Sequence, residues 1–135
     1  LAMLYRSGVL LDTETLCSGK DMQKILPVLE DIHRNYAENL TLEEASARLG
    51  FAESYFCRLF RNATGATFTE YVNFVRISKA EKLLAKTEMT VLEISQAVGF
   101  SSASYFNRIF RKYRSCTPHA YRALKNVETD TAAGV

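Results

Sequence analysis

The 135-residue chain lacks the features on which several protein classes depend. No apolar run approaches the ~20 residues that cross a bilayer, so no membrane span is expected. Only two prolines are present, and no alternating β-rich runs, which favours an all-α fold. The three cysteines, Cys17, Cys57 and Cys116, lie 40 and 59 residues apart, a spacing that suits neither a zinc site nor a disulfide framework. We therefore expect no metal site, reduced thiols and a cytoplasmic location.

Sequence motifs of catalysis are missing as well. There is no glycine-rich phosphate loop, no nucleophile elbow, and no Ser/His/Asp or Cys/His arrangement with local support. His33 and His119 have no second ligand at metal-like spacing, so they are expected to be ordinary surface or core histidines. The sequence therefore predicts no catalytic residues, no cofactor and no enzyme.

The net charge of +2 conceals an uneven distribution. Thr41–Lys125 holds 13 Lys and Arg against 7 Asp and Glu, a net +6, and the rest of the chain is −4. Within that region Thr41–Tyr71 is −1 and Thr90–Lys125 is +5. Concentrated positive charge suits a polyanionic partner, and the later segment is expected to supply most of the attraction.

An internal repeat is the most informative feature that the sequence does contain. Thr41–Phe51 (TLEEASARLGF) returns as Thr90–Phe100 (TVLEISQAVGF), and Ser54–Arg61 (SYFCRLFR) returns as Ser104–Arg111 (SYFNRIFR). Each copy is predicted to be a short helix, a glycine turn and a second helix with a basic polar face. This is the pattern of a helix-turn-helix, whose second helix enters the major groove of DNA. Two such units in one small chain indicate a protein that reads DNA.

The helix boundaries of the two copies are predicted at matching places. Thr41-x-x-Glu44 and Thr90-x-x-Glu93 are both capping boxes, in which threonine and glutamate satisfy the free N–H groups at a helix start. Gly50 and Gly99 are expected to end those helices, because glycine takes a positive φ at little cost.

The second helix of each unit is predicted to have an apolar and a polar face. Its apolar positions recur at helical spacing and are expected to be buried: Phe56, Leu59, Phe60 and Ala63, and then Phe106, Ile109, Phe110 and Tyr113. Tyr55 and Tyr105 could be packing residues or stacking platforms for bases, and we interpret them as packing residues. Cys57 lies on the polar face and is interpreted as a passive small residue.

The polar face near the start of that helix supplies candidates for base contacts. Arginine suits guanine, asparagine suits adenine, serine suits either, and glutamate accepts from cytosine N4. The candidates of these types are Arg58, Arg108, Asn107, Ser54, Ser104 and Glu53. Basic residues further along the helix are better placed for phosphates, namely Arg61, Arg111, Lys112 and Arg114.

Further helices are expected around the repeat. A first helix is predicted over about Asp21–Tyr36, and Thr67-x-x-Glu70 is predicted to begin a connecting helix that ends near Lys86. Its ~20 residues would span ~30 Å. This length is close to one ~34 Å turn of B-DNA, so we expect one monomer to read two successive major-groove segments. Thr117-Pro118 is predicted to begin a last short helix.

These elements define the expected domain organisation. Residues 1–20 are interpreted as the remnant of an upstream domain and a linker, and residues 126–135 as a flexible tail. Residues 21–125 are expected to form one DNA-binding domain, with its helix-turn-helix units at about 37–65 and 87–116.

With these residues assembled, the chain resembles the DNA-binding region of the AraC/XylS family of bacterial transcription regulators, from Ile25 to Leu124. The most specific stretches are Arg76–Thr87 (RISKAEKLLAKT), Val91–Phe100 (VLEISQAVGF), Ser104–Lys112 (SYFNRIFRK) and Thr117–Arg122 (TPHAYR). The resemblance implies seven helices, with two helix-turn-helix units on a connecting helix. It also implies promoter binding, usually with activation through RNA polymerase.

Position by position, the resemblance also implies a set of base-contacting residues. These are Glu53, Ser54, Cys57 and Arg58 in the first unit, and Ala103, Ser104, Asn107 and Arg108 in the second. Most family members carry a separate effector or dimerisation domain, of which Leu1–Leu11 is the candidate remnant here. Ser115 departs from the family, which usually has glycine at this place, as Gly65 is in the first unit. Ser115 must therefore take a positive φ at a cost or alter the turn.

Two functions are compatible with these features. The first is a sequence-specific regulator that binds double-stranded promoter DNA, as an activator. The alternative is a helical protein-interaction module that has kept the fold without specific DNA binding. Salt distinguishes them, because phosphate contacts weaken by orders of magnitude between about 50 and 200 mM salt and an apolar interface does not.

Overall fold

The computed structural model describes residues 19–134, and the side chains of residues 19–126. These residues form seven helices and no strand: α2 (Gly19–Asn35), α3 (Leu42–Leu49), α4 (Glu53–Thr64), α5 (Phe68–Lys86), α6 (Val91–Ala97), α7 (Ala103–Arg114) and α8 (Pro118–Gly134). The predicted all-α fold is confirmed. The expectations for Leu1–Leu11 and most of the linker lie outside the described residues. Within residues 19–134, no helix combines the length and apolar character that crossing a membrane requires.

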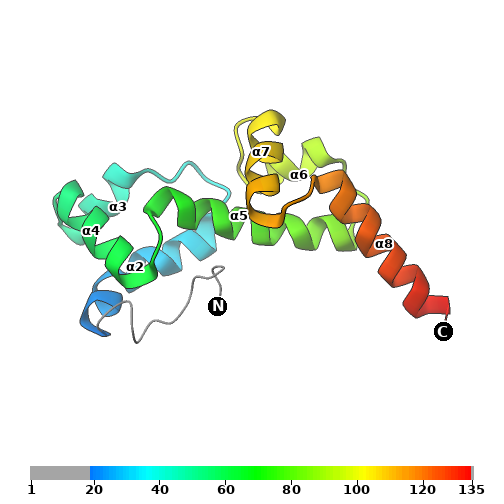
Figure 1. Ribbon diagram of the computed structural model, residues 1–135. Coiled ribbons are helices and arrows are strands. Elements are labelled where there is room, and N and C mark those ends of the chain that lie inside the picture. The colour runs from blue at the N-terminus through cyan, green and yellow to red at the C-terminus, as the bar shows by residue number, and fades with distance from the viewer. Residues whose placement is uncertain (1–18, 135) are drawn as a thin grey trace. The chain divides into compact units, whose positions relative to one another are not determined.

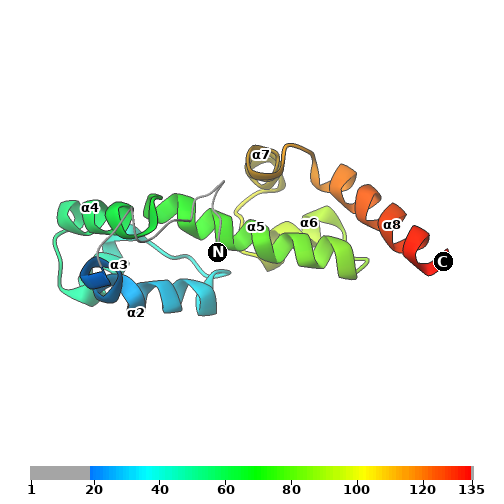
Figure 2. The ribbon, with the colours of Figure 1, turned by 60° about the horizontal axis from the view of Figure 1, so that its bottom comes forward.

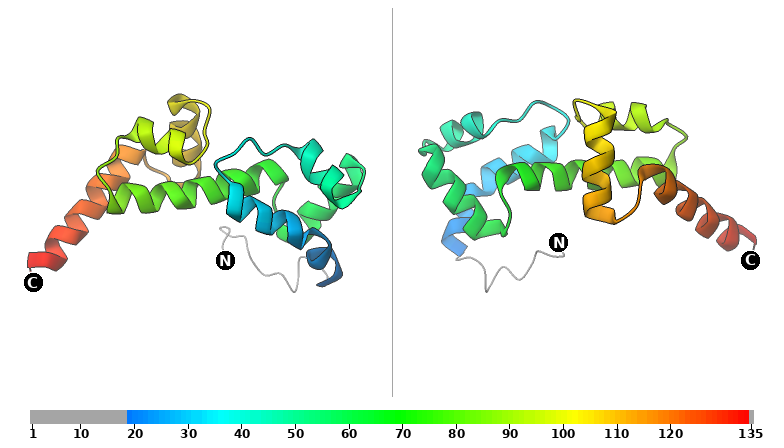
Figure 3. Two further views of the ribbon diagram at one scale, coloured as in Figure 1. Left: turned by 180° about the vertical axis from the view of Figure 1, so that it is seen from behind. Right: turned by 45° about the horizontal axis from the view of Figure 1, so that its top comes forward.

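The chain divides into two compact units, and the boundary between Val72 and Asn73 falls inside α5. In the first unit, α2, α3 and α4 gather beside the beginning of α5 (Figures 1 and 2). In the second, α6 and α7 lie over the rest of α5, and α8 leads away from them (Figure 3). Each unit therefore contains one helix-turn-helix, α3–α4 or α6–α7, supported by part of α5.

Threonine caps begin four of these helices, and at α8 the Thr117 hydroxyl accepts from the Ala120 N–H at 3.1 Å. The Thr90 hydroxyl accepts from the Glu93 N–H at 3.0 Å, and the Glu93 carboxylate accepts from the Thr90 N–H at 2.8 Å. Thr67 and Glu70 make the same reciprocal pair at the start of α5. At Thr41 the hydroxyl accepts from the Glu44 N–H, but the Glu44 carboxylate accepts from that hydroxyl instead of the cap N–H. The capping box predicted at Thr41 is therefore only half formed, because the hydroxyl takes the place of the N–H as donor.

The turns inside the two units are closed by the same hydrogen bonds. Gly50 donates to Ala47 O and Phe51 to Ser46 O, and the matching bonds run from Gly99 to Gln96 O and from Phe100 to Ser95 O. Both glycines have positive φ, 73° and 103°. The predicted turns are confirmed, although α6 ends at Ala97 and Gly99 follows its C-cap Val98.

The core of the first unit lies between α2 and α4. The buried stripe predicted for α4 is confirmed in full. It packs with the buried face of α2, which is Ile25, Val28, Leu29 and Ile32. Phe56 and Phe60 also meet Phe68 at ring-centroid distances of 6.0 and 5.8 Å. These aromatic contacts fix α4 in the unit, so its opposite face is turned to solvent.

The core of the second unit repeats this arrangement on α7. Phe106, Ile109 and Phe110 are buried, but Tyr113 is only half-buried. The Tyr113 ring lies 6.4 Å from that of Phe74 on α5. The fourth position of the predicted stripe is therefore at the edge of the core.

The ends of α2, α7 and α8 add detail to the predicted helix boundaries or differ from them. α2 begins at Gly19 and ends at Asn35, so Tyr36 lies half-buried in the turn after the helix and not on its apolar face. α8 begins at Pro118 as predicted but continues to Gly134, because no proline or glycine interrupts it earlier. Ser115 takes φ 63°, the one positive φ of a non-glycine residue in the described part of the chain.

Candidate nucleic-acid interface

The outward face of α4 lies opposite its buried stripe. All the residues that the sequence assigned to this face are exposed: Glu53, Ser54, Cys57, Arg58 and Arg61. The helix begins without a side-chain cap, because Ala52 stands at the N-cap. The carboxylate of Glu53 in the first turn interacts favourably with the helix dipole there.

The outward face of α7 is similar in position and more basic. Ser104, Arg108, Arg111 and Lys112 are exposed, whereas Ala103 and Asn107 are half-buried. The helix has a cap of its own, since the Ser102 hydroxyl accepts from the Tyr105 N–H at 3.1 Å. This face combines a serine, an asparagine and an arginine near the helix start with two cations in the last turn.

One predicted phosphate-contacting residue is engaged inside the second unit. Arg114 is bidentate to Glu81 of α5, and its Nη2 donates to Glu81 Oε1 at 2.8 Å. The side chains are 27% and 20% exposed. Arg114 thus ties α7 to α5, a role that sequence reasoning missed, and the geometry does not favour its assignment to phosphate. The signal was present in the sequence, because Glu81 is the one acidic residue in the later half of α5.

A second arginine connects α8 to the end of α5. Arg122 of α8 donates through Nε to Leu84 O at 3.0 Å and through Nη2 to Thr87 O at 3.1 Å. Leu84 lies in the last turn of α5 and Thr87 directly follows the helix. Carbonyls at this end lack a partner within the helix, so a cationic donor satisfies them and interacts favourably with the helix dipole. Arg114 and Arg122 thus connect α7 and α8 to α5 and the residue that follows it.

A tyrosine lies beneath the candidate guanine-reading arginine in each unit. The Arg58 guanidinium carbon is 5.7 Å from the centre of the Tyr55 ring, and that of Arg108 is 5.1 Å from the Tyr105 ring. Both tyrosines are half-buried and pack edge-on against the turn phenylalanine, Phe51 or Phe100. The prediction that they are packing residues is confirmed, but their contact with the arginines was not foreseen.

Burial shifts the pKa of residues that pack behind these faces. It raises the pKa of Tyr71, whose hydroxyl lies 2.9 Å from His33 Nε2. Burial also lowers the pKa of Arg76, whose guanidinium lies over the Phe100 ring at 5.7 Å. His33 is itself exposed, which confirms its interpretation as a surface histidine.

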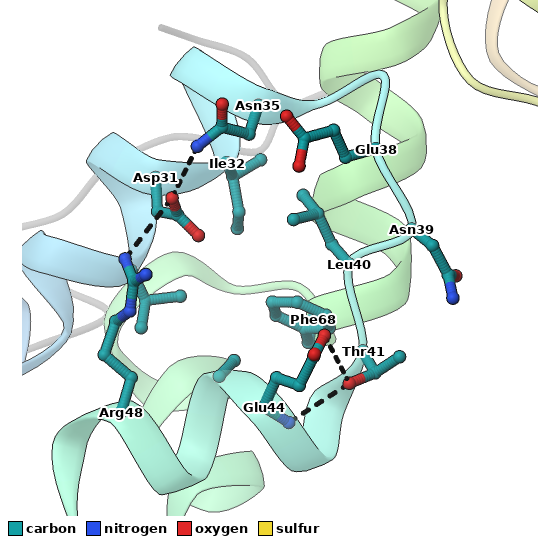
Figure 4. Close-up of a pocket in the computed structure, with 12 residues that line it drawn as sticks. Asp31, Ile32, Asn35, Glu38, Asn39, Leu40, Thr41, Glu44, Arg48 and Phe68 are labelled. Carbon is teal, nitrogen blue, oxygen red and sulfur yellow. Dashed lines mark hydrogen bonds and ion pairs between the residues drawn. The ribbon is translucent and has the colours of Figure 1, made fainter.

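The first unit also contains a pocket of about 300 Å³ between α2, the loop that follows it, and α3. Figure 4 shows Asp31 at its edge, accepting from Asn35 at 2.7 Å and paired with Arg48 at 3.3 Å. Glu38 and Glu44 add further carboxylates, and none of the lining residues comes from α4. Such an acidic lining repels phosphate, so this pocket is separate in position and charge from the candidate DNA-binding face.

Ligand-binding chemistry of other kinds finds little support in residues 19–126. No group of three or more His, Cys, Asp or Glu there is arranged to hold a metal ion. Of the two cysteines in that range, Cys57 is exposed and Cys116 half-buried, and both are free thiols.

Comparison with known proteins agrees with this geometry. A family model described as a helix-turn-helix domain matches residues 45–124. The regulatory protein PocR of Salmonella typhimurium is 32% identical over 103 residues, which cover 76% of this chain and 34% of PocR. The chain spans 13–34% of the length of the first curated relatives that it matches.

Solved structures of DNA-binding regulators have a fold similar to that of this chain. The crystal structure of an AraC-type transcriptional regulator from Chromobacterium violaceum matches with a TM-score of 0.72 and 25% identity, covering 80% of this chain and 96% of that one. The DNA-binding domain of AdpA, solved in complex with a target DNA, matches with a TM-score of 0.69 and 27% identity. That match covers 82% of this chain and 96% of the AdpA chain.

Proposed function

The chain belongs to the AraC-type helix-turn-helix family of DNA-binding transcription regulators, and we propose that it binds promoter DNA by placing α4 and α7 in two successive major-groove segments. The observation that carries this proposal is the repeated unit. Both copies have the same turn hydrogen bonds, the same three buried apolar positions and an arginine at the same outward position. The complex of the AdpA domain with its target DNA supports the same use of the fold.

Base readout is assigned to the first two turns of each recognition helix. Arg58 and Arg108 pair with guanine through their forked N–H donors, and Asn107 pairs with adenine. Ser54, Ser104 and Glu53 lie beside them, and Cys57 and Ala103 provide small surfaces that let the helix approach the bases. Loss of one good bidentate contact costs about 1–3 kcal/mol and relaxes specificity at one base pair.

Phosphate contact is assigned to exposed cations in the last turns of α4 and α7. These are Arg61 on α4, and Arg111 and Lys112 on α7. Arg114 is left out because Glu81 already holds it. Phosphate contacts carry no sequence information, so their loss weakens binding to all duplexes about equally.

The regulatory consequence that we propose is activation of transcription in the cytoplasm. Binding at a promoter would bring the domain beside RNA polymerase, and a dimer partner would act through a separate domain. The chain spans about a third of the length of PocR.

Selection from a random duplex library at near-physiological salt tests the two-segment mode. The expected result is a site with two short motifs about one helical turn apart, roughly 10 base pairs. A single enriched motif would contradict the two-segment mode and assign readout to one unit. Absence of binding at low salt would contradict the function itself and favour the protein-interaction module.

Two matched variants of α7 test the residue roles. Arg108→Ala is expected to lose discrimination at one base pair, whereas Arg111→Ala is expected to weaken all sequences and lower the salt slope by about one. Equal effects of the two variants on every sequence would show that Arg108 does not read a base.

A further inference from the structure

The same tyrosine–arginine arrangement occurs in both recognition helices. Tyr55 precedes Arg58 by three residues, and Tyr105 precedes Arg108 by three, so each pair lies on one side of a helix. The guanidinium carbons are 5.7 and 5.1 Å from the ring centres. Both values fall within the ~6 Å over which a cation is attracted to an aromatic face.

Each ring is held in place by contacts with the rest of its unit. Tyr55 packs against Phe51 with ring centres 5.0 Å apart, and its hydroxyl accepts from Lys24 Nζ at 3.3 Å. Tyr55 therefore contacts α2 as well as the turn.

The second unit has the firmer anchor. Tyr105 packs against Phe100 with ring centres 5.7 Å apart, and its hydroxyl accepts from Asn73 Nδ2 at 3.2 Å. Asn73 is a buried residue of α5, 6% exposed. A ring fixed at its edge by a phenylalanine and at its hydroxyl by a buried amide offers the arginine a surface of constant position.

A fixed surface matters because an exposed arginine has many rotamers. Binding DNA restricts them, and the lost entropy reduces affinity. A guanidinium over a ring face interacts through its charge, so its N–H donors can still meet guanine O6 and N7. Contact with the ring thus removes part of the rotamer freedom of the arginine before DNA binds.

We propose that Tyr55 and Tyr105 are positioning residues, whose rings orient Arg58 and Arg108 for base readout. This inference rests on the proposed function, because it assigns the tyrosines a role only through the arginines. It goes beyond packing, since packing alone predicts that a tyrosine variant weakens every DNA sequence alike.

The test is a double-mutant cycle on α7. Library selection with Arg108→Ala first identifies the base pair at which discrimination is lost. The ratio of Kd values for duplexes mismatched and matched at that base pair is then measured for the wild type, Tyr105→Leu, Arg108→Ala and the double variant. Leucine keeps the apolar contact with Phe100 and removes the aromatic face.

The expected result is a loss of discrimination that depends on the arginine. Tyr105→Leu lowers the Kd ratio about two- to fivefold, the range of an exposed cation–π contact. The double variant has the same ratio as Arg108→Ala alone. An unchanged ratio in Tyr105→Leu, or an equal loss of affinity for both duplexes, would overturn the inference.

The proposed function fails in a different way from the inference. If Arg108→Ala leaves the preference unchanged at every base pair, base readout by Arg108 is wrong and the positioning role is wrong with it. If Arg108→Ala loses discrimination and Tyr105→Leu does not, readout stands and only the positioning role is overturned.

Two further variants distinguish the effect of the aromatic ring from the effect of the hydroxyl and from a loss of stability. Tyr105→Phe keeps the ring and removes the contact with Asn73, so it is expected to retain the wild-type ratio. A loss as large as that of Tyr105→Leu would overturn the role of the ring.

Tyr55→Leu repeats the experiment against Arg58 without leaving a buried donor unpaired, because Lys24 is exposed. Urea unfolding of each variant verifies that the compared proteins are folded.

Discussion

Ser115 is expected to be a position where a single change to glycine stabilises the second unit. It caps α7 at φ 63° and ψ 16°, and its N–H donates to Arg111 O at 2.8 Å. Gly65 caps α4 at φ 82° and ψ 2°, and its N–H donates to Arg61 O at the same distance. Two caps with the same geometry therefore carry different residues, which makes each the control for the other.

The magnitude follows from two opposing terms. A residue with a Cβ loses about 1–2 kcal/mol in the left-handed region, and glycine avoids this loss. Glycine also makes the unfolded chain more flexible, which offsets about 0.4–1 kcal/mol. Ser115→Gly is thus expected to raise the free energy of unfolding by about 0.5–1 kcal/mol, and Gly65→Ser to lower it by about as much.

Urea unfolding followed by far-UV circular dichroism measures both changes. Ser115→Ala is the control for the hydroxyl, because alanine is strained at this φ as serine is, and it is expected to change stability little. Two results together would refute the reasoning. Ser115→Gly would fail to raise the unfolding midpoint, and Gly65→Ser would leave it unchanged.

Three other substitutions or modifications test separate parts of the structure. Thr90→Ala removes a capping box and is expected to lower the free energy of unfolding by about 1 kcal/mol in urea, and a loss below about 0.3 kcal/mol would contradict the cap. Arg114→Ala is expected to lower the free energy of unfolding by about 1–2 kcal/mol, a loss between those of exposed and buried ion pairs. It is expected to leave the salt slope of DNA binding unchanged, and a slope reduced by about one would show that Arg114 contacts a phosphate. In a variant with Cys17 and Cys116 changed to serine, alkylation of Cys57 is expected to slow when the selected duplex is bound, and equal rates would place α4 outside the groove.

The repeated positions account for most of what the sequence predicted correctly. Apolar residues at helical spacing, such as Phe56 and Phe60, indicate which face of a helix is buried. A threonine three residues before a glutamate indicates a helix start. Both signals depend on neighbours within a single turn of helix. The helices α3 to α7 were therefore predictable to within a residue or two from local pattern alone.

The sequence was least informative chiefly where a distant residue decides the contacts of a side chain. Arg114 reads as another cation of a basic helix, and only the approach of Glu81 on α5 shows that it is engaged. Tyr113 fits the helical spacing of its stripe but reaches the edge of the core beside Phe74. The length of α8 depends on the absence of a stop signal before Gly134, which is weaker evidence than a cap. Contacts between helices are not encoded in spacing along one helix.

The two units keep one geometry and differ in charge, and the proposed mode of binding gives that difference a consequence. α7 has three outward cations, Arg108, Arg111 and Lys112, whereas α4 has Arg58 and Arg61 and also carries Glu53. A carboxylate on the DNA-facing side opposes the phosphates and leaves base contact as the favourable use of that position. The second unit then supplies most of the salt-dependent affinity. The first unit binds at the high local concentration that this anchoring creates, so it can discriminate between sequences while contributing little affinity of its own.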